Sequence, residues 1–274
     1  MVLPMNRRLA ASIFLSAGFV IGQTPEARQL APTGTLRATF LGGNPVQGRV
    51  DSKTGEVTGP VADITRELAH RLGVPFQIKA AAGVRGVLGA IQMQTADLGF
   101  LAFDATRAAE VDFSEPYALA YNTYVVRTDS PFKKVADTDR EGIRIAARKG
   151  DSGELYLSRT LKHAQLKSIE GLSVEQAERM LAAHEIDAFG TNRQRLVEDT
   201  ARFPDLRLLD DNFFGVEQSL AVSKGDPARL AYLDRLIDDL RAGGFLQAAI
   251  DHAQLHGVEV APGKTRSGRR PAQP

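Results

Sequence analysis

The chain contains neither cysteine nor tryptophan in its 274 residues. The absence of cysteine excludes a disulfide scaffold, a thiolate metal site and a cysteine nucleophile. Positive and negative charges almost cancel, at a formal net charge of +1, so the bulk electrostatics do not indicate a nucleic acid partner. The 5 histidines are scattered, and no helically spaced pair faces a nearby carboxylate. We therefore expect neither a bound metal nor another cofactor.

Long apolar runs are also scarce, and the clearest one lies near the N-terminus. It spans Leu9–Ile21, follows Arg7 and Arg8, and is too short for a comfortable membrane span. This pattern predicts a signal peptide over residues 1–24, so the mature chain is expected to be exported to the periplasm as a soluble protein. An N-terminal membrane anchor is the alternative.

The two ends of the mature chain show no clear apolar periodicity. Residues 23–33 are expected to form a flexible lead-in. Residues 261–274 combine Lys and Arg with Gly, Ser and Pro, which predicts a disordered basic tail. A basic arm that binds a partner is the alternative for this tail.

Between these ends, short apolar segments alternate with amphipathic ones. Strands are expected at Thr35–Leu41, Val74–Ala80 and Leu98–Phe103, with an amphipathic helix at Val61–Leu72. This alternation with short connections predicts an α/β fold with a mostly parallel sheet flanked by helices. Asn44 lies in the turn after the first strand, where open α/β sheets place their ligand-contacting loops.

Two strand-like segments further along the chain predict crossings between two lobes. They are Tyr121–Arg127 and Gln218–Ser223, and a new strand–helix unit begins between them. We expect a discontinuous lobe formed by residues 34–124 with 221–258, wrapped around a continuous lobe formed by residues 125–220. Two crossings act as a hinge, and the cleft between the lobes is the natural ligand site.

The stretch Ala96–Tyr117 carries the clearest chemistry. Asp104 can cap the turn that follows the strand ending at Phe103, so that backbone amides and the Arg107 side chain gather at one point. A guanidinium beside exposed amides suits a carboxylate, which it can bind through two parallel hydrogen bonds. The alternative is that Arg107 is a solvated surface charge, the commoner environment of an arginine.

This stretch resembles the signature of the type II periplasmic solute-binding proteins, family 3, which serve polar amino acid ABC importers. Asp97, Arg107 and the block Val111, Asp112, Phe113, Ser114, Pro116 and Tyr117 stand in the order of that signature. The resemblance extends over Leu36–Leu255. It implies a two-lobed fold with two hinge crossings, Arg107 as the anchor of a ligand carboxylate, and a membrane permease as the partner.

The resemblance also points to residues in the second lobe. Ser152 falls on a hydroxyl position of the family's strand–turn–helix loop, which holds the far side of the ligand carboxylate. Asp151 departs from the pattern, because a carboxylate there repels an anionic ligand unless it faces solvent or caps the next helix. Simple capping by both residues is the alternative. Asn192 replaces the aspartate that pairs with the ligand's amino group, so that charge-assisted bond is lost.

Further departures lie in the first lobe. Ala102 replaces a hydroxyl residue of the family, and Val84 replaces the aromatic side chain that often stacks on the ligand. Tyr121, with Tyr117 and Tyr124, is a candidate for lining the cleft, and packing in the core or hinge is the alternative. These departures favour a small carboxylate-bearing solute that needs no ammonium, or whose ammonium is bound in another way.

The resemblance therefore implies the solute-capturing component of an importer, which we expect to be a monomer and not an enzyme. One alternative is a lyase resembling cyclohexadienyl dehydratases, with Asp104 or Asp151 as the acid. Another is a sensor protein that presents its bound ligand to a receptor. The sequence does not separate the importer from the sensor.

Overall fold

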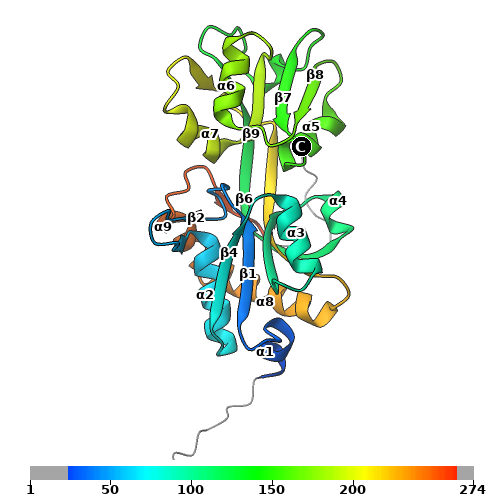
Figure 1. Ribbon diagram of the computed structural model, residues 1–274, viewed down its shortest axis with the longest axis vertical. Helices are drawn as coiled ribbons and strands as arrows, with labels where there is room; N and C mark the ends of the chain where they lie inside the picture. The colour runs from blue at the N-terminus through cyan, green and yellow to red at the C-terminus, as the bar shows by residue number, and fades with distance from the viewer. Residues whose placement is uncertain (1–23, 264–274) are drawn as a thin grey trace, which may run out of the picture.

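Two bodies, joined by two long strands, make up the protein (Figure 1). The structure is a computed structural model that describes residues 24–263. Residues 1–23 of the predicted signal peptide and residues 264–274 of the predicted tail lie outside the described residues. Within residues 24–263, the helices lack the combination of length and apolar character needed to cross a bilayer.

The connecting strands are β6 (Val111–Arg127) and β11 (Phe214–Ser223). We call the body that contains the first described helix lobe 1, and it holds α1 (Pro25–Leu30), β1 (Leu36–Leu41), β2 (Arg49–Val50), β3 (Val57–Thr58), α2 (Pro60–Leu72), β4 (Phe76–Ala81), α3 (Val84–Gln92), β5 (Leu98–Ala102), α4 (Ala105–Ala108), α8 (Pro227–Ala242), α9 (Phe245–His252) and β12 (Glu259–Val260). Lobe 2 holds the short helix η1 (Val135–Asp137), β7 (Arg144–Arg148), α5 (Ser152–Thr160), β8 (Gln165–Ile169), α6 (Val174–Ala182), β9 (Ala188–Asn192), α7 (Arg193–Thr200) and β10 (Leu206–Leu208).

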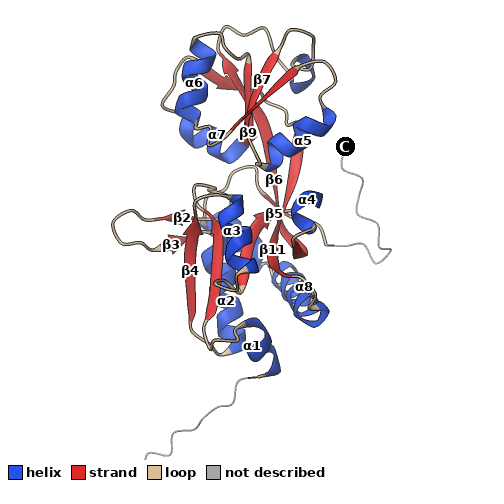
Figure 2. Cartoon of the chain, turned by 45° about the vertical axis from the view of Figure 1, so that its right-hand side comes forward, coloured by secondary structure: helices blue, strands red, loops and turns tan. Residues whose placement is uncertain are grey.

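One sheet runs through both lobes, in the order β4-β1-β5-β11-β6-β9-β7-β8. In lobe 1, β1 pairs in parallel with β4 and β5, and in lobe 2, β7 pairs in parallel with β8 and β9. The antiparallel pair β6 and β11 joins these two parallel blocks (Figure 2). The structure confirms the predicted α/β fold with two lobes, each built on a mostly parallel sheet flanked by helices.

The crossing strands change neighbours slightly before the predicted lobe boundaries. β6 pairs with β11 as far as Asn122 and with β9 from Asn122 onwards. β11 joins β5 of lobe 1 from Gln218, where a β-bulge also interrupts its pairing with β6. Residues 122–124 therefore pair within lobe 2 and residues 218–220 within lobe 1, which corrects the predicted boundaries. Because both strands run straight through the junction, the sequence contains no break to mark it.

Each lobe has hydrophobic clusters of its own. In lobe 1, α2 and α8 pack against one face of the sheet, and α3 packs against the other. In lobe 2, α6 and α7 cover one face and α5 the other. Among the described residues, none of these clusters contains side chains of both lobes. The lobes can therefore separate without breaking a hydrophobic core, as hinge motion requires.

An arginine–aspartate pair fastens the sheet of each lobe in the same way. In lobe 1, Arg37 on β1 donates to Asp97, which precedes β5, from Nε to Oδ2 at 2.9 Å and from Nη2 to Oδ1 at 2.6 Å. In lobe 2, Arg144 on β7 donates to Asp187, which precedes β9, with both distances 3.0 Å. Each aspartate also accepts the backbone N–H of its arginine. These bonds tie the first of the three parallel strands of each lobe to the segment that enters the third of them along the chain, β5 or β9.

The helices before these aspartates also end alike. Gln94 follows α3 and His184 follows α6, and both adopt a left-handed conformation, with φ of 56° and 54°. Each lies three residues before the aspartate that accepts two hydrogen bonds from the arginine side chain, a pairing that we call the arginine fork. Such conformations are uncommon for residues other than glycine, so their recurrence at the same place is informative. The two lobes are built on one repeated plan.

The ends of the described chain differ from the expectation. Residues 24–33 of the predicted lead-in form part of the fold instead, because α1 buries Ala27 and Leu30 in the lobe 1 core. Thr24, the last residue of the predicted signal peptide, is the N-cap of α1, and its side chain accepts the Ala27 N–H. The sequence does hold this signal, since Thr-Pro-Glu supplies a cap, a proline at the first turn and an acidic residue.

The predicted tail also starts too early. β12 pairs with β6, and Ala261 is fully buried and accepts a hydrogen bond from Arg241 Nε at 2.9 Å.

The strands β12 of lobe 1 and β8 of lobe 2 were not expected from the sequence. Both strands are short, and they are recognisable mainly by the partner strand beside which they lie.

Asp187→Asn is expected to lower the free energy of unfolding at pH 7 by about 1–3 kcal/mol, because it removes the charge from the fork of Arg144. Burial opposes ionisation of Asp187, but the hydrogen bonds and charge of Arg144 outweigh it and hold the pKa of this carboxyl below its ordinary value. The stabilisation is therefore present above the unfolded pKa of about 4 and is lost as pH falls through the folded pKa.

Urea unfolding of parent and variant at pH 7 and pH 3 measures this effect. Asp129→Asn is the matched control, because Asp129 lies in the same lobe with a side chain that is 74% exposed. Equal stability of Asp187→Asn and the parent at pH 7 would contradict the role of the fork.

Candidate functional site

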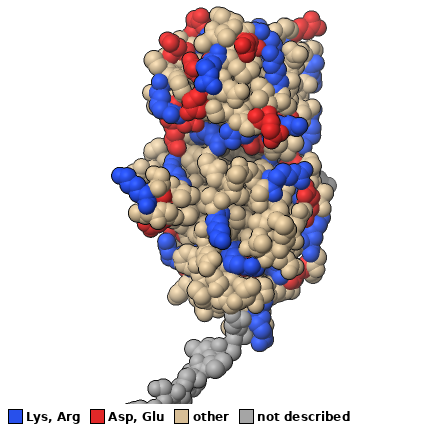
Figure 3. Space-filling model, in the orientation of Figure 1, with Lys and Arg blue, Asp and Glu red and all other residues tan. Residues whose placement is uncertain are grey.

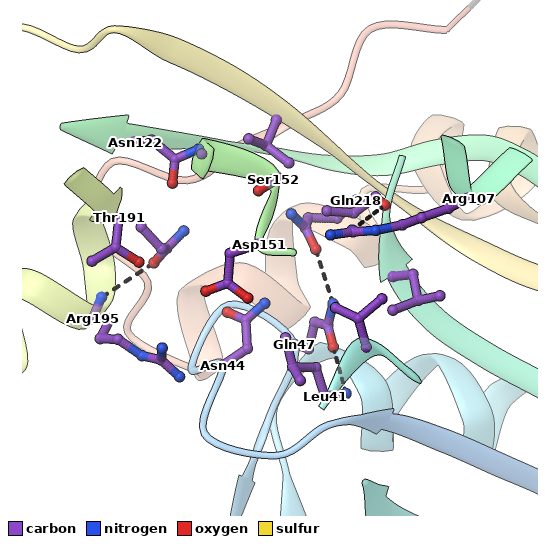
Figure 4. A pocket seen from close by; sticks show the side chains of 16 residues that line it. Leu41, Asn44, Gln47, Arg107, Asn122, Asp151, Ser152, Thr191, Arg195 and Gln218 are labelled. Carbon is purple, nitrogen blue, oxygen red and sulfur yellow. Dashed lines mark hydrogen bonds between the residues drawn. The ribbon is translucent and has the colours of Figure 1, made fainter. Parts of the chain in front are cut away.

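A cavity of about 40 Å³ lies between the lobes (Figure 4). Lobe 1 contributes the loop after β1 and the Arg107 side chain from α4, and lobe 2 contributes the first residues of α5 and α7. The middle parts of β6 and β11 complete the wall. This is the edge of the sheet where the parallel strands end and helices begin, which favours the binding of anions. The cavity has room for only a few water molecules, so the lobes are closed.

Arg107 is buried at this interface, with 4% of its surface exposed. Its Nη1 donates to the carbonyl oxygen of Ala102 at 2.8 Å, and its Nη2 donates to that of Gly150 in lobe 2, also at 2.8 Å. The Nε–H is buried and has no hydrogen-bond partner within residues 24–263. Burial lowers the pKa of this guanidinium, and the charges of Asp104 and Asp151 oppose that shift. Arg107 is therefore a buried cation bonded to backbone carbonyls rather than to a carboxylate.

The predicted role of Asp104 as the N-cap of α4 is confirmed. One carboxylate oxygen accepts the Thr106 N–H at 2.8 Å, and the other accepts a hydrogen bond from Arg159 of α5 at 3.0 Å. Burial tends to raise the pKa of Asp104, but the Thr106 amide and the Arg159 guanidinium outweigh it and lower the pKa. The cap of α4 is thus also an ion pair between the lobes.

Arg195 makes the reciprocal contact from lobe 2. Its Nε donates to the carbonyl oxygen of Gly43 in the loop after β1 at 3.1 Å, and its Nη2 donates to the same oxygen. Its backbone N–H is accepted by the Asn192 side chain, which caps α7. Gly43 and Gly150 have φ of 75° and 79°, a conformation that glycine adopts without strain. Thus one arginine side chain of each lobe donates a hydrogen bond to a glycine carbonyl oxygen of the other lobe.

Asp151 lies between Arg107 and Arg195 (Figure 4). It occupies the N-cap position of α5, but its side chain makes no capping hydrogen bond. Burial raises the pKa of its carboxyl, although the charges of Arg148, Arg195 and Arg107 oppose the shift. The alternative that Asp151 serves only as a helix cap is therefore wrong, and its carboxylate lines the cavity instead.

Three buried amide side chains in the wall were not identified from the sequence. Gln47 accepts the Leu41 N–H at 3.0 Å and donates to Gln218 at 3.1 Å. Asn122 lines the cavity from β6, and its Nδ2 is buried without a hydrogen-bond partner. Gln47 and Gln218 lie 171 residues apart in sequence, so only the crossing of β11 into lobe 1 brings them together.

Most of the predicted site residues line this cavity, namely Asn44, Val84, Ala102, Arg107, Asp151, Ser152 and Asn192. Tyr121 does not, which corrects the prediction. Side chains alternate along β6, so Asn122 faces the cavity while the Tyr121 hydroxyl reaches Glu259 at 3.4 Å. Tyr117 and Tyr124 are buried in the cores of lobe 1 and lobe 2.

Arg195 is the charged residue of the cavity that the sequence analysis missed. It shares the first turns of α7 with Arg193, which instead donates to the carbonyl oxygens of Leu209 and Asp210. The sequence shows both arginines, and only the orientation of α7 selects between them. The signal that could have pointed to Arg195 is its place three residues after Asn192, the N-cap of α7, because Arg107 lies three residues after Asp104, the N-cap of α4.

A family match covers most of the chain. Residues 41–253 match the family described as bacterial extracellular solute-binding proteins, family 3. The chain belongs to this family. The resemblance seen in the sequence is thereby confirmed, and the two lobes of this solute-binding protein are those of the type II periplasmic binding fold.

Two curated relatives are less than 30% identical to this chain. The probable ABC transporter extracellular-binding protein YckB of Bacillus subtilis is 27% identical over 58% of this chain and 55% of its own length. Membrane-bound lytic murein transglycosylase F of Pseudomonas fluorescens is 24% identical over 90% of this chain and 52% of its own length. The solute-binding protein spans about half the length of these curated relatives.

Solved structures share the fold. A variant of ArgBP from T. maritima has a TM-score of 0.67 at 22% identity, covering 84% of this chain and 99% of its own. AncCDT-1, described as an ancestral amino acid-binding protein and a precursor of cyclohexadienyl dehydratase, has a TM-score of 0.66 at 23% identity, covering 82% and 97%. At these identities the likeness establishes the fold and not the solute.

The rim of the junction carries charged side chains of both signs (Figure 3). Arg49 of lobe 1 pairs with Glu198 of lobe 2, and Arg159 of lobe 2 pairs with Asp104 of lobe 1. The Arg159 side chain is 51% exposed, so water screens its pair with Asp104. These rim pairs favour closure, but each contributes little.

Arg159→Gln is expected to shift the balance between closed and open lobes toward the open form by less than about fivefold, since a half-exposed ion pair contributes up to about 1 kcal/mol. Because the chain has no cysteine, one cysteine introduced at an exposed position in each lobe allows specific dye labelling. Energy transfer between the dyes then reports closure. Arg202→Gln, which removes a half-exposed arginine paired within lobe 2, should leave the transfer unchanged. No change with Arg159→Gln would show that this pair does not favour closure.

Proposed function

We propose that this solute-binding protein captures a small polar solute that carries a carboxylate and delivers it to the membrane permease of an ABC importer. It acts outside the cytoplasm, as a monomer and without catalysis. The observation that supports the proposal most directly is that Arg107 lines the cavity and that its buried Nε–H has no hydrogen-bond partner among the described residues. A buried donor left unpaired is costly, and a carboxylate is the acceptor that best satisfies a guanidinium.

The protein's own arginine forks indicate how that carboxylate is held. Arg37 and Arg144 each grip an aspartate through Nε and Nη2. Arg107 presents the same pair of nitrogens, with Nε unpartnered and Nη2 bonded to the carbonyl oxygen of Gly150. A solute carboxylate that accepted hydrogen bonds from both nitrogens would offer two oxygens that share a negative charge, in place of one neutral carbonyl oxygen. Such bonds are shorter and stronger than bonds to a neutral carbonyl.

Capture requires that the lobes part and close again. The closed cavity of about 40 Å³ is too small to admit an organic solute from outside without opening. Hydrogen bonds of Arg107 and Arg195 join the lobes, and none of the hydrophobic clusters among the described residues crosses the junction, so opening breaks no apolar core. A solute bonded to both lobes shifts the balance to the closed form by its preference for that form.

A lyase on the same fold is a second candidate, and Asp151 is the observation that favours it. Its carboxyl has a raised pKa and lines the cavity, as a general acid requires. Asp104, the other acid considered from the sequence, is held ionised by Arg159 and is a poor proton donor. Release of carbon dioxide and water from prephenate-like substrates would support the lyase, and binding of the intact acid would support the binding protein.

Arg107→Gln is expected to weaken solute binding by about 100-fold or more, because about 3 kcal/mol of charge-assisted bonding is lost. A thermal-shift panel of amino acids, oxo acids, dicarboxylates and aromatic acids identifies solutes that stabilise the parent protein. Calorimetry with those solutes then gives the affinity of parent and variant. Arg107→Lys, which keeps the charge and loses the fork, should fall between them.

The matched control is Arg66→Gln, which removes an arginine on the exposed face of α2 in the same lobe. Its solute affinity should equal that of the parent. Circular dichroism verifies that each variant is folded before affinities are compared. Unchanged affinity in folded Arg107→Gln would remove the basis of the proposal.

A further inference from the structure

The cavity arginines hold equivalent positions in the two lobes. Arg107 lies on α4, directly after β5, and Arg195 lies on α7, directly after β9. β5 and β9 are themselves equivalent, since each is preceded by the aspartate of its lobe's arginine fork. Each cavity arginine donates to a loop glycine of the opposite lobe. The repeat that gives each lobe one fork also gives it one guanidinium in the cavity.

The electrostatic pattern along the cavity is positive, negative, positive. Arg107 and Arg195 lie on either side of Asp151 (Figure 4). The Asp151 side chain is free of the capping bond that its position at the start of α5 would allow. These three groups together carry one net positive charge. A solute of complementary pattern has two negative groups, one positive group between them and one net negative charge.

We infer that the solute is an acidic amino acid or a close analogue, with one carboxylate held by Arg107, the ammonium by Asp151 and the second carboxylate by Arg195. This inference rests on the proposed function, because it names the solute class of the same cavity. It places the ammonium at Asp151, at the start of α5, rather than at Asn192, at the end of β9. The sequence left two alternatives, a solute needing no ammonium and a solute whose ammonium is bound in another way, and the inference selects the second.

The contacts of Asn192 explain this relocation. Its side-chain oxygen accepts the backbone N–H of Arg195 at 3.1 Å and so caps α7. An amide oxygen engaged in this way, and without charge, is a weak acceptor for an ammonium. Asp151 supplies a full negative charge on the same side of the cavity, and Arg195, held in place by that cap, supplies the second anion site.

Other solutes leave a charge in the cavity unpaired. A neutral amino acid lacks the second carboxylate and gives Arg195 no anionic partner. A dicarboxylate without an amino group places two carboxylates beside the carboxylate of Asp151. A site built around charged groups discriminates strongly against an analogue that leaves one of them unpaired once water is excluded.

Calorimetry with four matched solute pairs tests the inference on the parent chain. The pairs are L-aspartate with succinate, L-glutamate with glutarate, and each acidic amino acid with its amide, L-asparagine or L-glutamine. We expect L-aspartate or L-glutamate to bind at least tenfold more tightly than both of its partners. An amide or an amino-free diacid that binds as tightly as the acidic amino acid overturns the inference.

Variants at two positions, Arg195 and Asp151, connect each preference to its residue. Arg195→Gln should reduce the preference for the acidic amino acid over its amide to less than threefold, and Arg195→Lys should retain part of it. Asp151→Asn should abolish the preference over the amino-free diacid. A merely structural role for either residue would weaken all solutes alike and leave these ratios unchanged, which would overturn the inference. The matched controls, Arg202→Gln and Asp129→Asn, alter exposed lobe 2 residues and should leave the ratios intact.

The inference and the proposed function fail in different ways. If other carboxylated solutes bind with dependence on Arg107 but no acidic amino acid does, the inference is overturned and the proposed function stands. If no carboxylated solute in the panel binds the parent chain, both are overturned.

Discussion

The protein depends on a contact between its lobes that is made by arginine side chains and not by apolar packing. Arg107 and Arg195 each reach across the cavity to a glycine carbonyl, and Arg49 and Arg159 form ion pairs at the rim. Apolar packing resists separation, because exposing apolar surface to water costs free energy in proportion to its area. Hydrogen bonds to carbonyls can be exchanged for bonds to water or to a solute at small net cost. A junction of this kind can open and close.

The carbonyl oxygen of Gly150 and a bound solute would compete for the same donor of Arg107. In the closed structure the Gly150 carbonyl accepts from Nη2 of Arg107, which is half of the fork that Arg37 and Arg144 use for carboxylates. A carbonyl is a weaker acceptor than a carboxylate, so it can hold the lobes together without excluding the solute. The contact that closes the protein therefore also maintains its cation in a position to bind an anion.

Internal repetition explains why these features occur in pairs. Each lobe has a fork between its first strand and the aspartate before its third, a left-handed residue before that aspartate, and an arginine on the helix after the third strand. The two lobes differ in the charge that their loops bring to the cavity. Asp151 at the start of α5 is the cavity's charged residue without a counterpart of like charge in the corresponding loop of lobe 1, where Asn44 lines the wall. The single negative charge thus comes from the asymmetry between two similar halves.

The sequence by itself determined the fold class, the family and the place of Arg107. Apolar periodicity and turn residues predicted most helices and strands, because those signals are local. It also predicted that Asp104 caps α4, since a cap acts two residues along the chain. Only the tertiary structure decided the roles of Gln218, Arg195 and Tyr121. Their roles depend on the β-bulge in β11, on the orientation of α7 and on which face of β6 meets the other lobe. Each of these is set by partners far away in sequence, and a local pattern of residue types carries no information about them.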